Sequence, residues 1–495
     1  MAVRIVVHGH FYQPPRENPW TGRIDPQPDA APYENWNARV SAEAYEANVN
    51  VDLDLPDGPR SVNNLERMSF DVGPTLMAWL ETEQPHVYRS ILKADETAIE
   101  RTGYGSAMAQ SFHHTILPLA TTRDIRTQVR WGLFDFRHRF GRHAAGMWLP
   151  ETAVNDAVLG ILIDEDISFT VLAPHQAELI STRDGGWARA SDGFDLSACY
   201  RYDHPDGSGR SLAVFFYDGD LAKDIAFGNL TEKAAVFLQG FIDRAGEEGI
   251  VHVATDGETY GHHRRFADIG LAWALFVEAE QRGIEITNYE AELHRRPPEL
   301  EVRIKRGEGS SWSCPHGVGR WMRDCGCSTY GPEGWNQEWR APLRAGLEVI
   351  RWAADETYDL LGKPIFVDPW GARDRYVSVV VGAATLQDFL EGETAGMADP
   401  ESLERARLLL ELQHNSMQMF TSCGWFFYDV SRIETVQILR YAARTLELLD
   451  ALGLTLPQDA YIPLLAEATS NDPSAGSAAT ILSSIVADPT TQGHL

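Results

Sequence analysis

Two acidic residues stand out in this sequence because each directly follows a short apolar segment. Glu151 comes just after residues 143–149 (HAAGMWL), and Asp256 comes after residues 250–255 (IVHVAT). Cleavage of a glycosidic bond needs one carboxylate to attack or stabilise the anomeric carbon and a second carboxyl group to protonate the leaving oxygen. The pair is consistent with glycoside chemistry, although an acid after a strand is more often a helix cap or a solvated loop residue.

Residues next to these acids offer further contacts to a sugar. Trp148 has an aromatic face on which a pyranose ring can stack. After Asp256, the side chains of Glu258, Tyr260 and His262 supply carboxylate, hydroxyl and imidazole groups. These neighbours favour a polar binding site for a small sugar unit.

The first 300 residues alternate short β-branched segments with amphipathic stretches, which predicts β/α units around a parallel sheet or barrel. Buried strands are expected at residues 4–8, 143–149, 167–172, 212–217 and 250–255. Residues 231–249 are expected to form a helix that is capped by Thr231 and ends at Gly249.

The candidate residues follow the expected strands, at their carboxyl ends. Ligands bind at this edge of parallel sheets because the loops there surround one crevice. His8 and His10 lie at the end of the first strand, as Glu151 and Asp256 do for two later strands. We therefore expect all four side chains at the same edge of the fold.

The pattern changes near residue 300 to a loop rich in Gly, Cys and Trp, followed by long stretches with helical spacing. Helices are expected at 339–362, 401–420 and 432–453. The predicted organisation is a catalytic part at 1–300, a loop and helical part at 301–465, and a flexible tail at 466–495.

Four segments resemble, in order, the first four motifs of glycoside hydrolase family 57. They are HGHFYQPPRE (8–17), QSFHHTILPLA (110–120), GMWLPETAV (146–154) and TDGETYGHH (255–263). A fifth segment, QMFTSCGWFF (418–427), is similar to the family's fifth motif only loosely. Four motifs in the same order are far more specific than any one of them.

The resemblance implies an α/β fold, an incomplete (β/α)7 barrel followed by a mainly α-helical C-terminal region. It implies that Glu151 is the nucleophile and Asp256 the acid/base of a retaining reaction. It also implies that His10, His114 and Trp148 line the sugar subsites. Family members include α-amylases, 4-α-glucanotransferases, branching enzymes and α-galactosidases, so an α-glucan or maltooligosaccharide is the expected substrate.

The same motifs make His8, Gln13 and Trp425 candidate substrate-binding residues. The fifth motif usually carries an Asp-Trp pair, whereas here Gly424 precedes Trp425. The segments SSWSCPHGVGRW and GWNQEWRAPLRA resemble a less studied branch of the family, in which the barrel is joined to a domain of unknown function. The choice between amylase, glucanotransferase and branching enzyme therefore stays open.

The loop after the barrel carries Trp312, Trp321, Trp335 and Trp339. Each of these tryptophans alone is more readily explained by core packing, because large aromatic side chains are usually mostly buried. As a group they also suggest a lid, with Trp312 and Trp321 as substrate contacts, that excludes water and favours transfer over hydrolysis.

The amino-acid composition argues against some classes of binding partner. Acidic residues exceed basic ones by 71 to 43, and the resulting net charge of -28 repels phosphate backbones and anionic lipid, so neither nucleic acid nor a membrane is an expected partner. The N-terminal segment has no long apolar region typical of a signal peptide, and no window is long enough for a membrane span. We expect a cytoplasmic enzyme, and the sequence leaves its oligomeric state open.

The chain has five cysteines, an odd number that fits reduced thiols better than a disulfide framework. Cys314, Cys325 and Cys327 cluster around His316, and thiolates with imidazole are zinc ligands. Their spacing matches no standard zinc finger, so no cofactor and no metal ligand is assigned from the sequence.

Two other functions compete with the glycoside reading. In a metal-dependent deacetylase or α-mannosidase-like barrel enzyme, one ion would be bound by His8, His10, Asp256, His262 and His263. Those families typically carry an Asp in their first motif, where this chain has Phe11 and Tyr12. A glucan-binding protein without turnover is the second alternative, and the presence of both carboxylates argues against it.

Overall fold

The chain folds into two compact units, described here from a computed structural model. The structure describes residues 3–246, 248–394, 396 and 399–488. Unit 1 consists of Met1–Gln13, Pro26–Ser111 and Phe136–Trp312, and unit 2 of Pro14–Asp25, Phe112–Asp135 and Ser313–Leu495. The expected change near residue 300 therefore has a structural counterpart at 312/313, but two earlier segments also belong to unit 2.

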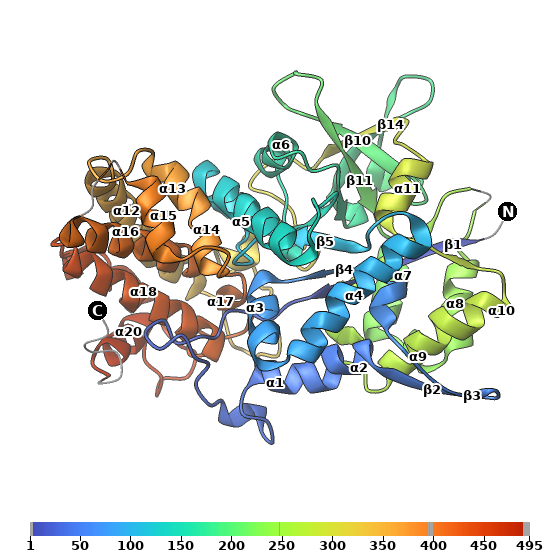
Figure 1. Ribbon diagram of the computed structural model, residues 1–495, viewed down its shortest axis with the longest axis horizontal. Coiled ribbons are helices and arrows are strands. Elements are labelled where there is room, and N and C mark those ends of the chain that lie inside the picture. The colour runs from blue at the N-terminus through green and yellow to red at the C-terminus, as the bar shows by residue number, and fades with distance from the viewer. Residues whose placement is uncertain (1–2, 247, 395, 397–398, 489–495) are drawn as a thin grey trace. The chain divides into compact units, whose positions relative to one another are not determined.

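Unit 1 is built on parallel strands (Figure 1). The first sheet has the order β12 (Val251–Asp256), β1 (Arg4–Phe11), β4 (Ser69–Val72), β5 (Ala107–Gln110) and β6 (Met147–Trp148), with β13 (Glu285–Ile286) also paired to β1. A parallel bridge from Gly146 to Phe169 leads on to β7 (Phe169–Leu172), which pairs in parallel with β11 (Ser211–Phe216). Seven strands thus follow one another in parallel, as expected for a β/α fold of this class.

Four further strands extend the part of unit 1 that contains β7 and β11. This second sheet continues from β11 through β10 (Cys199–Asp203), β14 (Leu300–Ile304), β8 (Ala177–Ser181) and β9 (Trp187–Arg189). These strands are all paired antiparallel except for β10 with β14, which are parallel. A separate hairpin is formed by β2 (Val51–Leu55) and β3 (Gly58–Val62). The segments expected as strands all contain strands, although β6 is much shorter than the expected 143–149.

Strand β1 is an interior strand, paired with β12 on one side and β4 on the other, and its sequence is apolar on both faces. Ile5, Val6 and Val7 are completely buried, as expected for a strand covered on both sides of a parallel sheet. Its carboxyl end carries His8 and His10 instead of apolar residues, and both histidines are also buried. Polar side chains therefore replace the apolar core at this end of the strand.

Helices connect the strands of unit 1. They are α1 (Trp36–Val40), α2 (Glu46–Val49), α3 (Pro74–Glu83), α4 (Pro85–Thr102), α6 (Asp156–Asp164), α7 (Gly219–Phe227), α8 (Ala234–Ile242), α9 (Ala267–Trp273), α10 (Ala279–Gln281) and α11 (Tyr289–Arg295). The expected helix 231–249 is present only as the shorter α8, and Thr231 is not its cap. Thr231 belongs to a separate turn, Leu230–Glu232, so the N-cap of α8 is Lys233. Its side chain makes no capping hydrogen bond.

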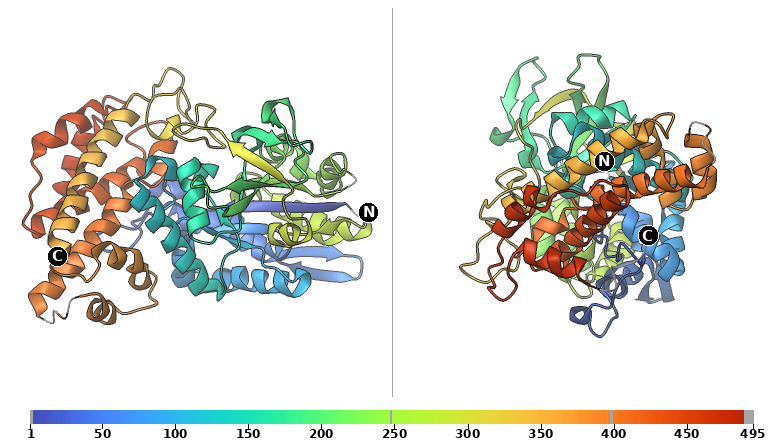
Figure 2. Two further views of the ribbon diagram at one scale, coloured as in Figure 1. Left: turned by 90° about the horizontal axis from the view of Figure 1, so that it is seen from above. Right: turned by 90° about the vertical axis from the view of Figure 1, so that its left-hand side faces the viewer.

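Unit 2 is helical, and its longest helices α12, α16 and α18 lie side by side (Figure 2). Its helices are α5 (Thr122–Phe140, in unit 2 up to Asp135), α12 (Arg340–Gly362), α13 (Pro369–Arg375), α14 (Val377–Val380), α15 (Leu386–Glu393), α16 (Pro400–Gln418), α17 (Cys423–Phe426), α18 (Ile433–Ala451), α19 (Ile462–Glu467) and α20 (Ala478–Val486). The three long helices agree closely with the ranges expected from periodicity.

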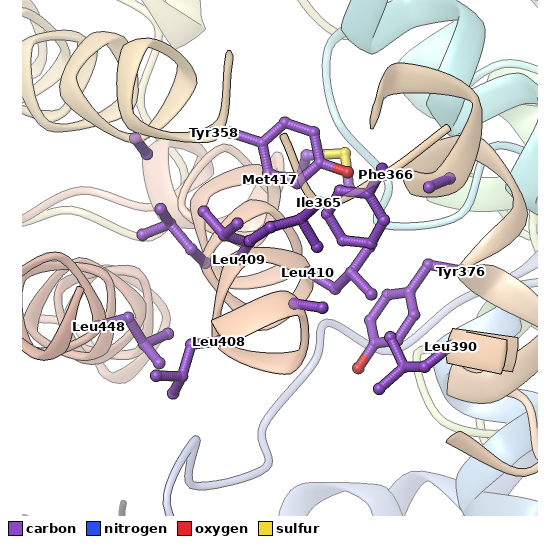
Figure 3. Packing of buried hydrophobic residues seen from close by; sticks show 14 of the residues in the cluster. Tyr358, Ile365, Phe366, Tyr376, Leu390, Leu408, Leu409, Leu410, Met417 and Leu448 are labelled. Atoms are coloured by element: carbon purple, nitrogen blue, oxygen red, sulfur yellow. The ribbon is translucent and has the colours of Figure 1, made fainter. Parts of the chain in front are cut away.

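The core of unit 2 follows from that periodicity. In α12, residues Leu343, Leu347, Ile350, Ala354 and Tyr358 recur every three or four positions and are all fully buried. Leucines of α16 belong to the same buried cluster as Ala354 and Tyr358 of α12 and the aromatic residues Phe366 and Tyr376 (Figure 3). The helical pattern in the sequence is therefore the pattern of the core.

The C-terminal segment expected as a flexible tail contains the helix α20. Its Ala478 and Leu482 are buried, and the helix contacts α18 and α19. Residues 489–495 lie outside the described part of the chain. In the part that the structure describes, no helix is both long and apolar enough to span a membrane.

We expect the substitution Leu409→Ala in α16 to destabilise unit 2 by about 2–5 kcal/mol, because it leaves a cavity in a fully buried site. Leu360 of α12 is 65% exposed, so Leu360→Ala should change the free energy of unfolding by less than about 0.5 kcal/mol. Denaturant unfolding followed by tryptophan fluorescence measures both, and equal effects would contradict the assigned core.

Candidate active site

Three chemically active side chains lie side by side at the carboxyl ends of neighbouring strands in unit 1. In the register of the sheet, His10 of β1 is paired with Asp256 of β12 on one side and with Asp71 of β4 on the other. Residues paired across parallel strands project to the same face. The sheet itself therefore gathers two carboxyl groups around one imidazole.

Asp71 is completely buried and is held between two histidines. One carboxylate oxygen is 3.0 Å from Nε2 of His8, and the other is 2.8 Å from Nδ1 of His10. A buried carboxylate requires such partners because desolvation of an unpaired charge is very costly. The pairing fixes both imidazole rings.

The two histidines differ in charge. Burial lowers the pKa of His8, so this ring is neutral near pH 7. Burial also opposes a charge on His10, but the negative charges of Asp71, Asp256 and Glu258 outweigh it and raise the pKa of His10 to about 9. A cationic imidazole therefore lies next to Asp256.

Asp256 is exposed at the end of β12. Desolvation by the surrounding protein raises the pKa of its carboxyl group, nearby Asp71 raises it further, and His10 lowers it, with a net increase. A carboxyl group with a raised pKa that remains accessible is suited to donate a proton.

Glu151 lies in a turn, Pro150–Thr152, that is separated from β6 by Leu149 alone. Its backbone has φ 58° and ψ 20°, and Thr152 also has a positive φ of 48°. Left-handed conformations of residues other than glycine cost on the order of 1–3 kcal/mol each and persist only where the surroundings enforce them. Two such residues in succession mark this turn as a strained segment.

Segment 310–312 and Gln176 hold the strained turn in place. The Gln176 side chain accepts a hydrogen bond from the Thr152 hydroxyl (2.9 Å) and donates one to the Thr152 carbonyl (2.8 Å). Trp312 donates its indole N–H to Oε2 of Glu151 (2.9 Å) and its backbone N–H to the Glu151 carbonyl (3.0 Å). Both the backbone and the carboxylate of Glu151 are thus oriented.

Aromatic rings connect the Glu151 turn to the histidines of β1. The Trp148 ring is stacked on His8 (4.6 Å between centroids) and on His10 (5.3 Å). Trp312 meets Trp148 edge-on at 5.2 Å and His10 at 6.1 Å. Glu151 and the His10 group are therefore joined by one continuous set of packed rings within unit 1.

Glu258 is buried two residues after Asp256. It accepts hydrogen bonds from the Tyr45 hydroxyl (2.5 Å) and from the Tyr12 backbone N–H (3.1 Å). Burial, followed by the negative charge of Asp256, raises the pKa of Glu258 to about 7. These contacts make Glu258 a fixed support of the loop after β1.

Comparison with protein families identifies the chain. A family model described as "Glycosyl hydrolase family 57" matches residues 30–305, more than half of the chain. The chain belongs to glycosyl hydrolase family 57. A second model, "Domain of unknown function (DUF3536)", matches residues 335–492, and the search of curated proteins gave no match.

Solved structures share the family 57 fold. An exo-type maltose-forming amylase from Pyrococcus sp. ST04 is 16% identical, with a TM-score of 0.69 over 94% of this chain and 83% of that one. A 4-α-glucanotransferase from Thermococcus litoralis is 14% identical, with a TM-score of 0.53 over 91% of this chain and 60% of that one. A family 57 branching enzyme from Thermococcus kodakaraensis is 14% identical, with a TM-score of 0.51 over 95% of each chain. Identities this low establish the fold alone.

The family 57 motifs in unit 1 converge, but several of their side chains are buried. His8, Trp148 and Tyr260 have no exposed surface, so they have no face open to a sugar and act as supports. The Tyr260 hydroxyl is 3.4 Å from the Thr255 hydroxyl, and the Tyr260 carbonyl accepts a 2.6 Å hydrogen bond from Asn48.

Other predicted side chains of unit 1 keep some exposure or lie just beneath the surface. Gln13 is almost buried and donates a 3.0 Å hydrogen bond to the Tyr45 hydroxyl. His262 is partly exposed and bonded to Glu43. Trp312 is partly exposed beside Glu151. Of the predicted binding residues, His262 and Trp312 remain the most accessible.

Three predicted binding residues lie in unit 2. His114 is buried, and its Nδ1 is 2.6 Å from the Ser422 hydroxyl, which brings the second and fifth family 57 motifs together. Trp321 and Trp425 are 0% and 1% exposed, so the structure assigns them to the core and not to stacking on a sugar. Trp425 packs in parallel against Phe420 with centroids 6.0 Å apart.

Unit 2 also contains a cavity of about 160 Å³. Its lining includes Thr115 and Phe420 together with the charged side chains of Asp124, Arg344 and Arg351. Neither proposed catalytic residue of family 57 lines it.

Sequence reasoning missed two side chains of the site. Asp71, the partner of both histidines, follows the strand segment SF in β4, and the same strand-end argument that selected Asp256 applies to it. Tyr217 follows β11, is buried, and lies close enough to Asp256 that burial and the negative carboxylate raise its pKa. The pairing of β1 with β4 brings Asp71 into the site, and the effect of Asp256 on the pKa of Tyr217 brings Tyr217 into it.

The five residues proposed as ligands in a metal-dependent enzyme do not all meet in one group of donor atoms, although His8 and His10 both bond Asp71 and His10 is paired with Asp256. Among the described residues, the metal-ligand geometry of three or more His, Cys, Asp or Glu is met by Cys314, His316, Cys325 and Cys327 alone. His8 and His10 instead bond Asp71, and His262 bonds Glu43.

We expect Trp312→Phe to lower kcat by roughly tenfold, because the Glu151 carboxylate loses the indole donor that orients it. KM should change by less than about threefold, since Phe keeps most of the aromatic surface. Trp352, exposed on α12, provides the control Trp352→Phe, which should leave both constants unchanged. A change in KM alone would instead assign Trp312 to ground-state binding.

The folded protein should lose stability at alkaline pH through His10. Its pKa of about 9 lies above the ordinary value of 6.5, so its charge stabilises the fold fully below pH 6.5, and this contribution is lost as pH rises through about 9. His10→Gln should remove this pH dependence. Free energies of unfolding of both proteins from pH 6 to 10 test it, and identical slopes would contradict the assigned ion pair.

Proposed function

We propose that this chain is a retaining glycosyl hydrolase or transglycosylase that acts on α-1,4-linked glucans, with Glu151 as nucleophile and Asp256 as acid/base. The observation that carries the proposal is the position of Asp256, an accessible carboxyl group with a raised pKa beside a cationic His10. The oriented carboxylate of Glu151 in the same unit complements it.

In the first step, the proposed nucleophile Glu151 attacks the anomeric carbon while Asp256 protonates the leaving oxygen. The strained turn and the Trp312 donor keep the Glu151 carboxylate in one orientation, which lowers the entropic cost of the attack. The products of this step are a glycosyl ester on Glu151 and a shortened glucan.

Asp256 is ionised after it has donated its proton. The positive charge of His10, itself held by buried Asp71, stabilises this carboxylate. In the second step Asp256 takes a proton from the incoming hydroxyl, which cleaves the ester and restores the original anomeric configuration. The His10–Asp71 pair thus allows one carboxyl group to serve as acid and then as base.

The substrate class comes from the family and from the structures that share the fold. The three solved relatives are an exo-type maltose-forming amylase, a 4-α-glucanotransferase and a branching enzyme. These activities share one chemistry and differ in the acceptor that attacks in the second step. Hydrolysis, transfer and branching therefore remain alternatives within the proposal.

Of the two tryptophans predicted to control water access, Trp312 and Trp321, only Trp312 keeps this role in the proposal. Trp321 is completely buried in unit 2, which is the position of a packing residue. Trp312 is partly exposed and bonded to Glu151, which supports a proposed position beside the ester that the second step cleaves. A smaller side chain there would admit water, so a shift toward hydrolysis is the expected sign of this role.

We expect Asp256→Asn to reduce turnover of maltooligosaccharides by about 10²–10⁴-fold, because no group protonates the leaving sugar. A nitrophenyl glycoside, whose leaving group needs no proton, should be affected far less in the first step. Exposed Asp220 provides the matched control Asp220→Asn, which should retain full activity. Equal losses on both substrates would contradict the role of Asp256.

Product analysis identifies the reaction. Chromatography after incubation with amylose or maltooligosaccharides should show new reducing ends for hydrolysis, longer and shorter chains in equal measure for transfer, or new 1,6 branches for branching. Glu151→Gln should bind maltooligosaccharide but give no products. Wild-type protein that binds the glucan and produces none of these would establish a binding protein instead.

A further inference from the structure

Four potential metal ligands converge in unit 2, in the loop that precedes α12. Cys314, His316, Cys325 and Cys327 each offer one ligand atom, and these atoms all lie within 4.8 Å of one another. The donors belong to two short sequences, Cys-x-His and Cys-x-Cys, separated by eight residues. The loop therefore brings together two pairs of ligands.

The distances between the donors match tetrahedral zinc coordination. Cys314 Sγ is 3.8 Å from both Cys325 Sγ and Cys327 Sγ, and Cys327 Sγ is 3.5 Å from Nδ1 of His316. With Zn–S bonds of ~2.3 Å and a Zn–N bond of ~2.05 Å, tetrahedral angles place two sulfurs ~3.8 Å apart and sulfur and nitrogen ~3.5 Å apart. A disulfide would require ~2.05 Å, so these thiols are not bonded to each other.

The backbone of the loop is shaped to present these donors. Gly317 and Gly326 have φ values of +78° and +79°, which L side chains rarely adopt, and each follows a ligand residue directly. The Gly317 N–H donates to the Cys314 carbonyl (3.1 Å), and the Gly326 N–H donates to the Asp324 carboxylate (3.0 Å). Each ligand pair is therefore closed by a turn that depends on glycine.

Two buried guanidinium groups lie against the loop. Arg340 has no exposed surface and donates a 2.7 Å hydrogen bond to the Cys327 carbonyl. Arg320 is 7% exposed and donates to the Ser313 carbonyl (3.3 Å) and the Thr329 hydroxyl (2.8 Å). Zinc bound by three thiolates and one imidazole has a net charge of −1, so the two cations complement it.

We propose that Cys314, His316, Cys325 and Cys327 bind one zinc ion in a closed structural site. Four protein ligands leave no open coordination position, which separates this site from catalytic zinc. Binding of Zn²⁺ displaces the three thiol protons to solvent, and the four new bonds hold both turns of the loop together.

The zinc site fixes a segment whose regular secondary structure is limited to one short 3₁₀ helix, Gly319–Trp321. Arg340 donates to the Phe427 carbonyl (3.0 Å), and Gln337 donates to the Tyr428 carbonyl (3.1 Å). The loop is thereby attached to the segment after α17. Loss of the ion is expected to loosen these contacts within unit 2 and to lower the melting temperature of the protein.

Metal analysis of the full chain tests the proposal. Protein purified without chelator from zinc-supplemented cells should contain about one zinc per chain, as four-ligand sites hold one ion. The double variant Cys325→Ser, Cys327→Ser should lose it, while Cys423→Ser, at a cysteine outside the cluster, should retain it. Equal zinc in the double variant and the wild type, or iron in place of zinc, would overturn the assignment.

Cobalt substitution tests the site even if the double variant does not fold. Wild-type protein depleted of zinc and loaded with Co²⁺ should show thiolate-to-cobalt charge-transfer bands together with the visible bands of tetrahedral cobalt. Removal of metal should also lower the melting temperature, and zinc should restore it. Cobalt spectra without thiolate bands, or a melting temperature unaffected by metal removal, would contradict the structural zinc site.

Discussion

The buried carboxylate of Asp71 is the interaction on which the proposed chemistry depends. It is completely enclosed, and its two oxygens hold the imidazoles of His8 and His10. Because a buried anion favours a nearby cation, His10 carries a positive charge that would otherwise be lost on burial. That charge acts on Asp256, which the register of β1 and β12 places beside it.

The Glu151 turn is organised by a different principle. Its orientation comes from two left-handed residues held by Gln176 and by the segment that ends at Trp312. The strain is local and is offset by hydrogen bonds and by the packed rings around Trp148. The pKa of the Asp256 carboxyl group is thus set by neighbouring charges, and the orientation of the Glu151 carboxylate by backbone geometry. Both residues belong to unit 1.

The sequence predicted the elements better than the environment of their side chains. Periodicity located α12, α16 and α18 because their buried apolar residues recur every three or four positions. Short apolar segments located β1, β7, β11 and β12. The same reasoning could not distinguish an accessible tryptophan from a buried one: Trp312 reaches Glu151, whereas Trp321 and Trp425 are enclosed in unit 2. Asp71 was missed because its importance depends on which strands are neighbours, and the cysteine spacing could not show that four donors meet.

The most direct test of the central claim is the site of covalent labelling by a fluorinated glucosyl fluoride, which forms the glycosyl ester quickly and loses it slowly. Peptide mass spectrometry should find the sugar on Glu151; a label on any other residue would contradict the account.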